Sequence, residues 1–129
     1  MNEVYVAIFG VWLTKKIFIG KGHFPAEGCP SSVEFDFNKV MERQQKRGDF
    51  IGFYHTHPNM SNWYSSTDYA TMETWVDCFG KELLCLIEGN NGIATYKCGN
   101  YKMASKKMKF KFLNPHIRIK RIGNWFIGY

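Results

Sequence analysis

The sequence predicts a mixed α/β (α+β) domain, in which a mostly antiparallel sheet is flanked by two helices. Three observations support this fold class. Several short segments alternate apolar and polar residues as strands do, two longer segments repeat apolar residues at helical spacing, and glycine, proline or asparagine separates them. The 129 residues fit a single domain (1–129), and a hydrophobic content of 45% is enough for a packed core.

The N-terminal half of the chain predicts strands around one loop and one helix. Its strand segments are rich in Val, Ile and aromatic residues, and they lie at 3–9, 16–19, 33–35 and 50–57. Glycines and prolines predict a loop over 20–32. Asp36 can cap a helix over 37–47, where apolar residues recur at helical spacing before Gly48 ends the segment.

The C-terminal half predicts a second helix followed by two hairpins. Ser65 or Ser66 can cap this helix, which Gly80 ends. The strand segments lie at 82–87, 93–98, 107–113 and 116–122. The last two alternate basic and apolar residues around Asn114-Pro115, which predicts a basic C-terminal hairpin at about 105–122 with one packed and one solvated face.

Charge and composition restrict the class of protein. The net charge is +6, and no acidic residue follows Glu88, so the basic end could face an acidic partner or nucleic acid, or be a solvated strand face. No stretch approaches the roughly 20 apolar residues of a membrane span. The start Met1-Asn2-Glu3 lacks the features of a signal peptide. We therefore expect a cytoplasmic protein with no membrane partner, whose four cysteines are reduced.

The most informative motif is Tyr54-His55-Thr56-His57-Pro58, followed by Ser65 and Asp68. Two histidines two residues apart on a strand point to the same face, so both can reach one ion. Asp68 supplies a third ligand. Three protein ligands with one open position are typical of a catalytic zinc site, where the pKa of bound water falls from about 15.7 to about 7. The pattern predicts a metallohydrolase with one Zn²⁺ per chain.

Hydrolysis also needs a general base that is not itself a ligand. The upstream glutamates are Glu3, Glu27, Glu34 and Glu42. Glu27 lies in the predicted loop and Glu42 on a solvated helix face, whereas Glu3 and Glu34 border predicted strands. Ser65 can hydrogen-bond a bound water or a developing oxyanion, or it can simply cap the helix.

These residues resemble the JAMM motif of the JAB1/MPN/Mov34 metalloprotease family, in which a glutamate on the first strand precedes His-Ser/Thr-His-Pro and Ser-x-x-Asp. The segment from Glu3 to Gly10 is also similar to the first strand of that family. The likeness extends to about Ile93, and the compact chain looks like the prokaryotic members. It implies an MPN/cytidine-deaminase-like fold, with a curved sheet between two helices, and it favours Glu3 over Glu34 as the base.

The resemblance implies cleavage of a peptide or isopeptide bond after the C-terminal tail of ubiquitin or a ubiquitin-like protein, by deconjugation or precursor processing. The expected partner is such a protein or its conjugate, whose tail can lie along a sheet edge. Asn62, Trp63 and Tyr64 precede Ser65 and could line its path, or the aromatic pair could simply pack on the second helix. Compact members serve ubiquitin-like conjugation, sulfur-carrier processing, or antiviral and phage-related operons.

Other functions remain open at this stage. The basic hairpin with Phe110, Phe112 and Trp125 could bind nucleic acid, although strand alternation already explains these residues and makes that partner unlikely. A non-catalytic MPN-type interaction scaffold is a further alternative. Two histidines and a carboxylate also suit non-haem iron, whose usual motif order differs from this one.

Overall fold

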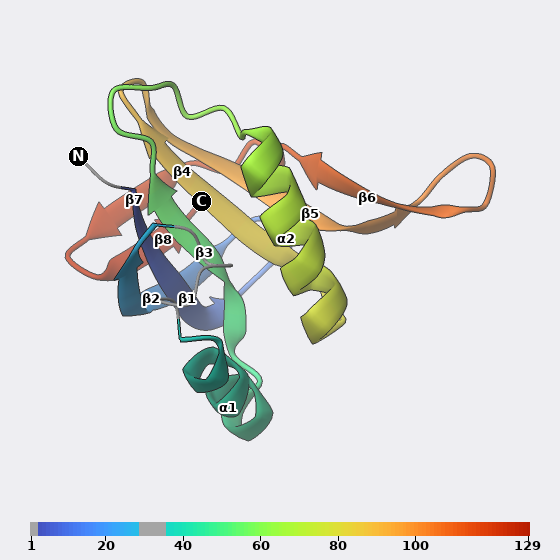
Figure 1. Ribbon diagram of the computed structural model, residues 1–129, viewed down its shortest axis with the longest axis horizontal. Helices are drawn as coiled ribbons and strands as arrows, with labels where there is room; N and C mark the ends of the chain where they lie inside the picture. The colour runs from blue at the N-terminus through green and yellow to red at the C-terminus, as the bar shows by residue number, and fades with distance from the viewer. Residues whose placement is uncertain (1–2, 29–35) are drawn as a thin grey trace.

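The computed structural model describes residues 3–28 and 36–129 (Figure 1). Its elements are β1 (Val4–Trp12), β2 (Phe18–Glu27), α1 (Phe37–Arg47), β3 (Phe50–Thr56), α2 (Ser66–Phe79), β4 (Leu83–Gly89), β5 (Gly92–Lys102), β6 (Met108–Leu113), β7 (Ile119–Ile122) and β8 (Trp125–Gly128). The strands form one sheet in the order β6-β5-β4-β3-β1-β2-β8-β7. Within it, β3 and β4 are parallel and the other neighbouring strands are antiparallel. The predicted mixed, mostly antiparallel fold class is confirmed.

Both helices pack on one face of this sheet. Val40 of α1 and Trp75 of α2 belong to a single buried cluster with Phe53 of β3. Phe37 of α1 lies against Trp75, with ring centroids 5.0 Å apart. Figure 1 shows α2 lying over β4 and β5, with α1 beside the lower end of β3. The expected sheet between two helices is therefore wrong, since the helices share a face.

The opposite face of the sheet is covered by the C-terminal part of the chain. Ile117 and Phe126 are buried there with Ile8 of β1 and Leu86 of β4. The Thr95 hydroxyl on β5 donates to the Ile117 carbonyl at 3.4 Å, so the segment before β7 crosses over the curled sheet. The chain thus closes its second apolar face with its own last strands.

The two helices begin and end as their sequences predict. The Asp36 carboxylate accepts a hydrogen bond from the Lys39 amide at 3.0 Å, and Gly48 ends α1 with a φ of 65°. Ser65 caps α2, and Gly80 ends it with a φ of 64°. Glycine reaches this left-handed region without the steric cost that other residues bear. None of the described helices is long and apolar enough to cross a membrane.

The loop predicted over 20–32 is wrong for its first part, because β2 continues to Glu27. The glycines of this segment serve close packing instead of a turn. A Cβ atom at Gly20 would lie 2.5 Å from Cγ2 of Ile8, and one at Gly22 would lie 2.5 Å from Cγ1 of Val6. The strand predicted at 33–35 lies outside the described residues.

The basic C-terminal hairpin predicted at about 105–122 is also wrong. Its two segments become β6, which pairs with β5, and β7, which pairs with β8, at opposite edges of the sheet. Alternation of apolar and basic residues reports which face of a strand is buried, but it does not report the pairing partner. The Asn114-Pro115 segment is therefore a crossing connection and not a hairpin turn.

Candidate metal centre

The two histidines of the motif lie at the carboxyl end of β3, in the middle of the sheet. Strand β3 is hydrogen-bonded to β1 on one side and to β4 on the other. His55 and His57 are only 1% and 4% exposed, and their ring centroids lie 4.9 Å apart. The expected placement of both imidazoles on one strand face is present. Burial leaves them little rotational freedom, so any ion between them would meet preoriented donors.

The proton of His57 is fixed by the loop that follows β3. Nδ1 of His57 lies 3.0 Å from the Ser61 carbonyl oxygen, which can only accept. Nδ1 therefore carries a hydrogen, which leaves Nε2 as the ring nitrogen available to a metal ion, as in metal-binding histidines oriented by a carbonyl. The loop is held in place by a bond of 2.8 Å from the Asn90 amide to the Met60 carbonyl. Gly89 permits this approach, because a Cβ there would lie 2.5 Å from the Asn62 nitrogen.

His55 lies deeper and contacts a ring, a carboxylate and a thiol. Tyr5 of β1 stacks on its imidazole at a centroid distance of 4.3 Å, and Nε2 lies 3.4 Å from Oδ1 of Asp68 and 3.8 Å from Sγ of Cys85. Burial lowers the pKa of His55, but Cys85 and the carboxylates of Asp68 and Glu3 raise it, and the net shift is upward. The surroundings of His55 therefore favour a positive charge. Nδ1 is buried with no hydrogen-bond partner among the described residues.

Asp68 joins the first turn of α2 to both histidines. Its Oδ2 lies 3.1 Å from Nε2 of His57, so the carboxylate reaches both imidazoles. The same oxygen accepts from the Ser65 amide at 2.8 Å, while Oγ of Ser65 accepts from the Asp68 amide at 3.1 Å. This reciprocal pair is a capping box. An ionised carboxylate has about four acceptor positions, so capping does not consume Asp68.

Glu3 approaches the same place from the start of β1. Its Oε1 lies 3.8 Å from Nε2 of His57, and its side chain is 38% exposed, so it borders the solvent-facing mouth of the site. Ligand atoms of Glu3, His55 and His57 all lie within 4.8 Å of one another. The Gly28 amide donates to the Glu3 carbonyl at 2.9 Å, which anchors the backbone there.

The other glutamates considered as bases are placed differently. Glu42 lies on the exposed surface of α1 and pairs with Lys46 at 2.8 Å. Glu27 ends β2, opposite Val4 of β1. Glu34 lies outside the described residues. Among the described glutamates, Glu3 is the one that the structure groups with both histidines.

The donor set fits a transition metal such as zinc. Two imidazole nitrogens and one or two carboxylate oxygens are ligands that zinc prefers, and the four side chains come from the start of β1, the end of β3 and the first turn of α2. The burial of both histidines and of Asp68 would be costly for unpaired charges, whereas a bound cation compensates it. His55, His57, Asp68 and Glu3 are therefore the residues that could hold or serve a metal ion.

Of the three residues predicted to bind substrate, two are packed into the fold and one is exposed. Asn62 is part of the scaffold, since its amide donates to Oδ1 of Asn91 at 3.0 Å and its carbonyl accepts from the Tyr96 hydroxyl at 3.0 Å. Tyr64 packs on Phe112 of β6 at a ring distance of 4.3 Å. Trp63 stacks on Tyr64 but remains 66% exposed. Of the three predicted residues, Trp63 therefore offers the most open surface.

Two neighbours of the site were not predicted from the sequence. Tyr5 stacks on His55, and its hydroxyl donates to Oδ1 of Asp68 at 3.4 Å. It lies two residues after Glu3, so strand alternation could have placed both on one face. Cys85 comes from β4, and no local signal connects it to β3. Hydrogen bonds from Cys98 and His55 lower the pKa of the Cys85 thiol to about 7 despite burial.

The fold and the site together define an α+β protein with a candidate metal centre. The sequence profile of the prokaryotic homologs of the JAB domain matches residues 12–103, a segment that includes both histidines, Ser65 and Asp68. The chain belongs to this family. Glu3 precedes the matched segment. No curated protein sequence matches the chain.

Proposed function

We propose that this chain is a zinc-dependent hydrolase of the JAMM type, in which His55, His57 and Asp68 hold the metal. One observation carries the proposal: two buried imidazoles and two carboxylates converge at the end of β3, and one of the carboxylates faces solvent. A structural role alone does not explain this arrangement, because a helix cap requires only Ser65 and Asp68. Membership of the JAB family also supports a hydrolase.

Burial separates the roles of the two carboxylates. Asp68 is 3% exposed and contacts both histidines, which suits a ligand. Glu3 is 38% exposed and lies farther from His57, which suits a group that exchanges protons at the mouth of the site. Zinc bound there supplies a Lewis acid and a water that ionises near neutral pH.

Glu3 then transfers the proton, and Ser65 donates a hydrogen bond. Glu3 accepts a proton from the attacking water and passes it to the nitrogen of the leaving amine, so that the scissile C–N bond breaks as the new C–O bond persists. Oγ of Ser65 already accepts from the Asp68 amide, but its own O–H remains able to donate. That hydrogen is directed to the oxyanion of the tetrahedral intermediate. His57 keeps its orientation through the Ser61 carbonyl.

For the substrate, we propose a peptide or isopeptide bond after the C-terminal tail of a ubiquitin-like protein, in the cytoplasm. Family membership supports this bond class. The exposed ring of Trp63, just before Ser65, supports an extended chain reaching the site across that loop. An MPN/cytidine-deaminase-like arrangement of the sheet and α2 around the site is part of the same proposal.

The test incubates zinc-loaded protein with a panel of ubiquitin-like fusions and measures cleavage after the terminal glycine. A chelator should abolish cleavage. Glu3→Gln should lower kcat by at least about 100-fold, because a positioned base contributes about 100- to 10,000-fold. The variant should retain bound zinc and its circular dichroism spectrum, which separates a base from a ligand.

Two results would contradict the proposal. Unchanged cleavage by Glu3→Gln would contradict the assignment of Glu3 as the base, and Glu73→Gln serves as the matched control on the exposed surface of α2. Protein that is purified without chelator and contains neither metal nor activity would instead favour the scaffold alternative.

A further inference from the structure

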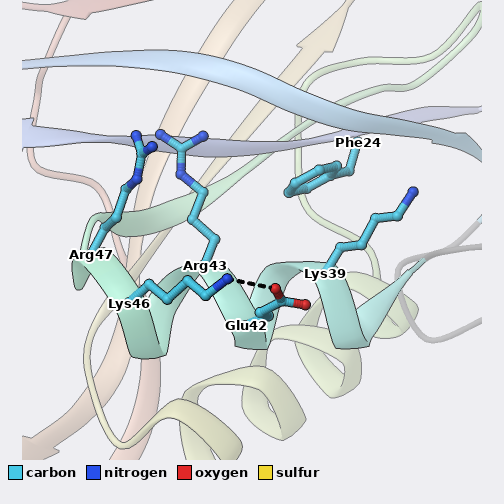
Figure 2. Close-up of a pocket in the computed structure, with 6 residues that line it drawn as sticks. All are labelled: Phe24, Lys39, Glu42, Arg43, Lys46 and Arg47. Carbon is cyan, nitrogen blue, oxygen red and sulfur yellow. Dashed lines mark hydrogen bonds and ion pairs between the residues drawn. The ribbon is translucent and has the colours of Figure 1, made fainter.

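A second polar region lies between α1 and β2. A groove of about 240 Å³ is lined by Phe24 of β2 and by five residues of α1 (Figure 2): Lys39, Glu42, Arg43, Lys46 and Arg47. Four of these side chains are cations and one is a carboxylate. Arg43 packs over Phe9, which lies six residues beyond Glu3 on β1, so the groove is roughly 20 Å along the strand from the candidate metal centre.

The four cations occupy one face of α1. Their positions, 39, 43, 46 and 47, have the spacing of neighbours on a helix surface. Like charges at this spacing destabilise an isolated helix. The helix dipole explains cations in the last turn, where Lys46 and Arg47 lie, and Lys39 in the first turn pairs with Asp36 at 3.8 Å. Ion pairs and the helix dipole therefore account for most of this face, and Arg47 is the cation left without a carboxylate partner among the described residues.

Carboxylates neutralise the groove only in part. Arg43 forms a two-point contact with Asp49, at 2.9 and 3.3 Å, and Lys46 pairs with Glu42 at 2.8 Å, which Figure 2 shows as a dashed line. Arg47 is exposed and has no ion pair among residues 3–28 and 36–129. In Figure 2 the guanidinium groups of Arg43 and Arg47 both extend toward the strands. An anion in the groove would meet the unpaired charge of Arg47, because the other three cations each have a carboxylate partner.

The opposite wall of the groove is aromatic because of a β-bulge. The pairing of β1 with β2 shifts register between Tyr5 and Ala7, and Phe24 has a φ of 57°, which is rare for a bulky residue. His23 and Phe24 are consecutive, yet both rings contact Phe9 at 5.7 Å. Ordinary alternation would place them on opposite faces. The bulge thus turns Phe24 toward the cations of α1, where Nζ of Lys39 lies 5.9 Å from its ring.

We propose that this groove binds a nucleotide, with the phosphate held by Arg43 and Arg47 and the base against Phe24. Guanidinium groups match the geometry of phosphate oxygens, and an aromatic ring stacks any base. The Glu42 carboxylate lies in the same groove and can accept a hydrogen bond from a ribose hydroxyl or an amino group of the base. A free nucleotide and the end of a single-stranded nucleic acid present the same chemistry.

Calorimetric titration of the full chain tests the proposal with three probes: a nucleoside monophosphate, inorganic phosphate and a short single-stranded oligonucleotide. We expect saturable binding of nucleotide at one site per chain, tighter than that of inorganic phosphate. Binding of the monophosphate identifies a free nucleotide as sufficient, whereas binding of the oligonucleotide alone identifies a nucleic-acid end. Affinity should fall as salt rises.

Substitutions then separate this groove from general positive charge. Arg47→Gln should weaken nucleotide binding about tenfold, the usual size for one charge-assisted contact. Arg47→Lys should weaken it less, because charge is kept and the planar fork is lost. Phe24→Leu should weaken nucleotide binding but leave inorganic phosphate binding unchanged. The control is Lys107→Gln, an exposed cation between β5 and β6.

Three outcomes would overturn the proposal. In the first, neither the monophosphate nor the oligonucleotide binds. In the second, Lys107→Gln and Arg47→Gln lose the same amount of nucleotide affinity. In the third, nucleotide and inorganic phosphate bind with equal affinity. Thermal unfolding of each variant shows whether it is folded. Arg47 is exposed at the surface of α1, so its variants remain informative even where Phe24→Leu is unstable.

Discussion

The two polar regions of this small domain differ in how they treat charge. At the end of β3, two buried histidines contact the carboxylate of Asp68, and Glu3 lies beside His57. Between α1 and β2, four cations of α1 line an open groove, and three of them are paired with carboxylates. We propose a cation for the first region and an anion for the second, although the net charge of +6 describes the chain only as basic. Local charge, and not the total, therefore indicates what each region can bind.

The largest expected effect separates the two regions by metal affinity. His57→Ala should reduce zinc affinity by more than about 100-fold, since changes to groups behind the ligands already reach 10- to 100-fold. Nucleotide binding in the groove should be unchanged. Zinc titration and calorimetry measure the two effects, with His116→Asn as a control because asparagine tolerates the positive φ of 55° at that exposed position. Equal zinc binding by both variants would refute the assigned site.

An intermediate effect compares the caps of the two helices. Ser65 and Asp36 both accept a backbone amide at a helix start, so alanine at either position should cost about 1 kcal/mol of unfolding free energy. Only Ser65→Ala should also lower kcat, by about 100-fold, because only that hydroxyl is placed to donate to an oxyanion. Urea unfolding and cleavage assays measure both. If the two variants lost stability alone, Ser65 would be a cap and nothing more.

The smallest expected effect concerns the pH dependence of stability through His23, the residue that precedes Phe24 of the groove. Burial, Arg43 and Lys21 lower the pKa of His23 from its ordinary value of 6.5, while Asp49 opposes the shift. The folded protein therefore binds this proton less readily than the unfolded chain. Stability is retained above 6.5 and declines as pH falls through the folded-state pKa. His23→Gln should flatten this slope slightly in urea unfolding measured at several pH values. An unchanged slope would show that other groups cause it.

The sequence predicted that His55, His57 and Asp68 lie close together, because the signals for their positions are local. Strand alternation placed His55 and His57 on one face, and the capping pattern placed Asp68 at the start of α2. The role of Glu3 required the resemblance to a family, since nothing local connects β1 to β3. The position of Glu3 beside His57 agrees with that expectation.

Features that depend on pairing between distant segments could not be predicted. Alternation in β6 and β7 gave their faces but not their partners, so the C-terminal hairpin was wrong. Glycines in β2 suggested a loop, although they allow neighbouring side chains to approach. The groove was not foreseen either, because it depends on a bulge that redirects Phe24 against the usual alternation.

The capping box of α2 links the folding of its first turn to the assembly of the site. Asp68 is bonded to Ser65 through both partners' amides, so its carboxylate is positioned only when the first helical turn exists. Conversely, the turn cannot unwind without withdrawing Asp68 from the histidines. Formation of the first turn of α2 therefore also positions Asp68 for the site, and fraying of this turn would remove the carboxylate from the two histidines.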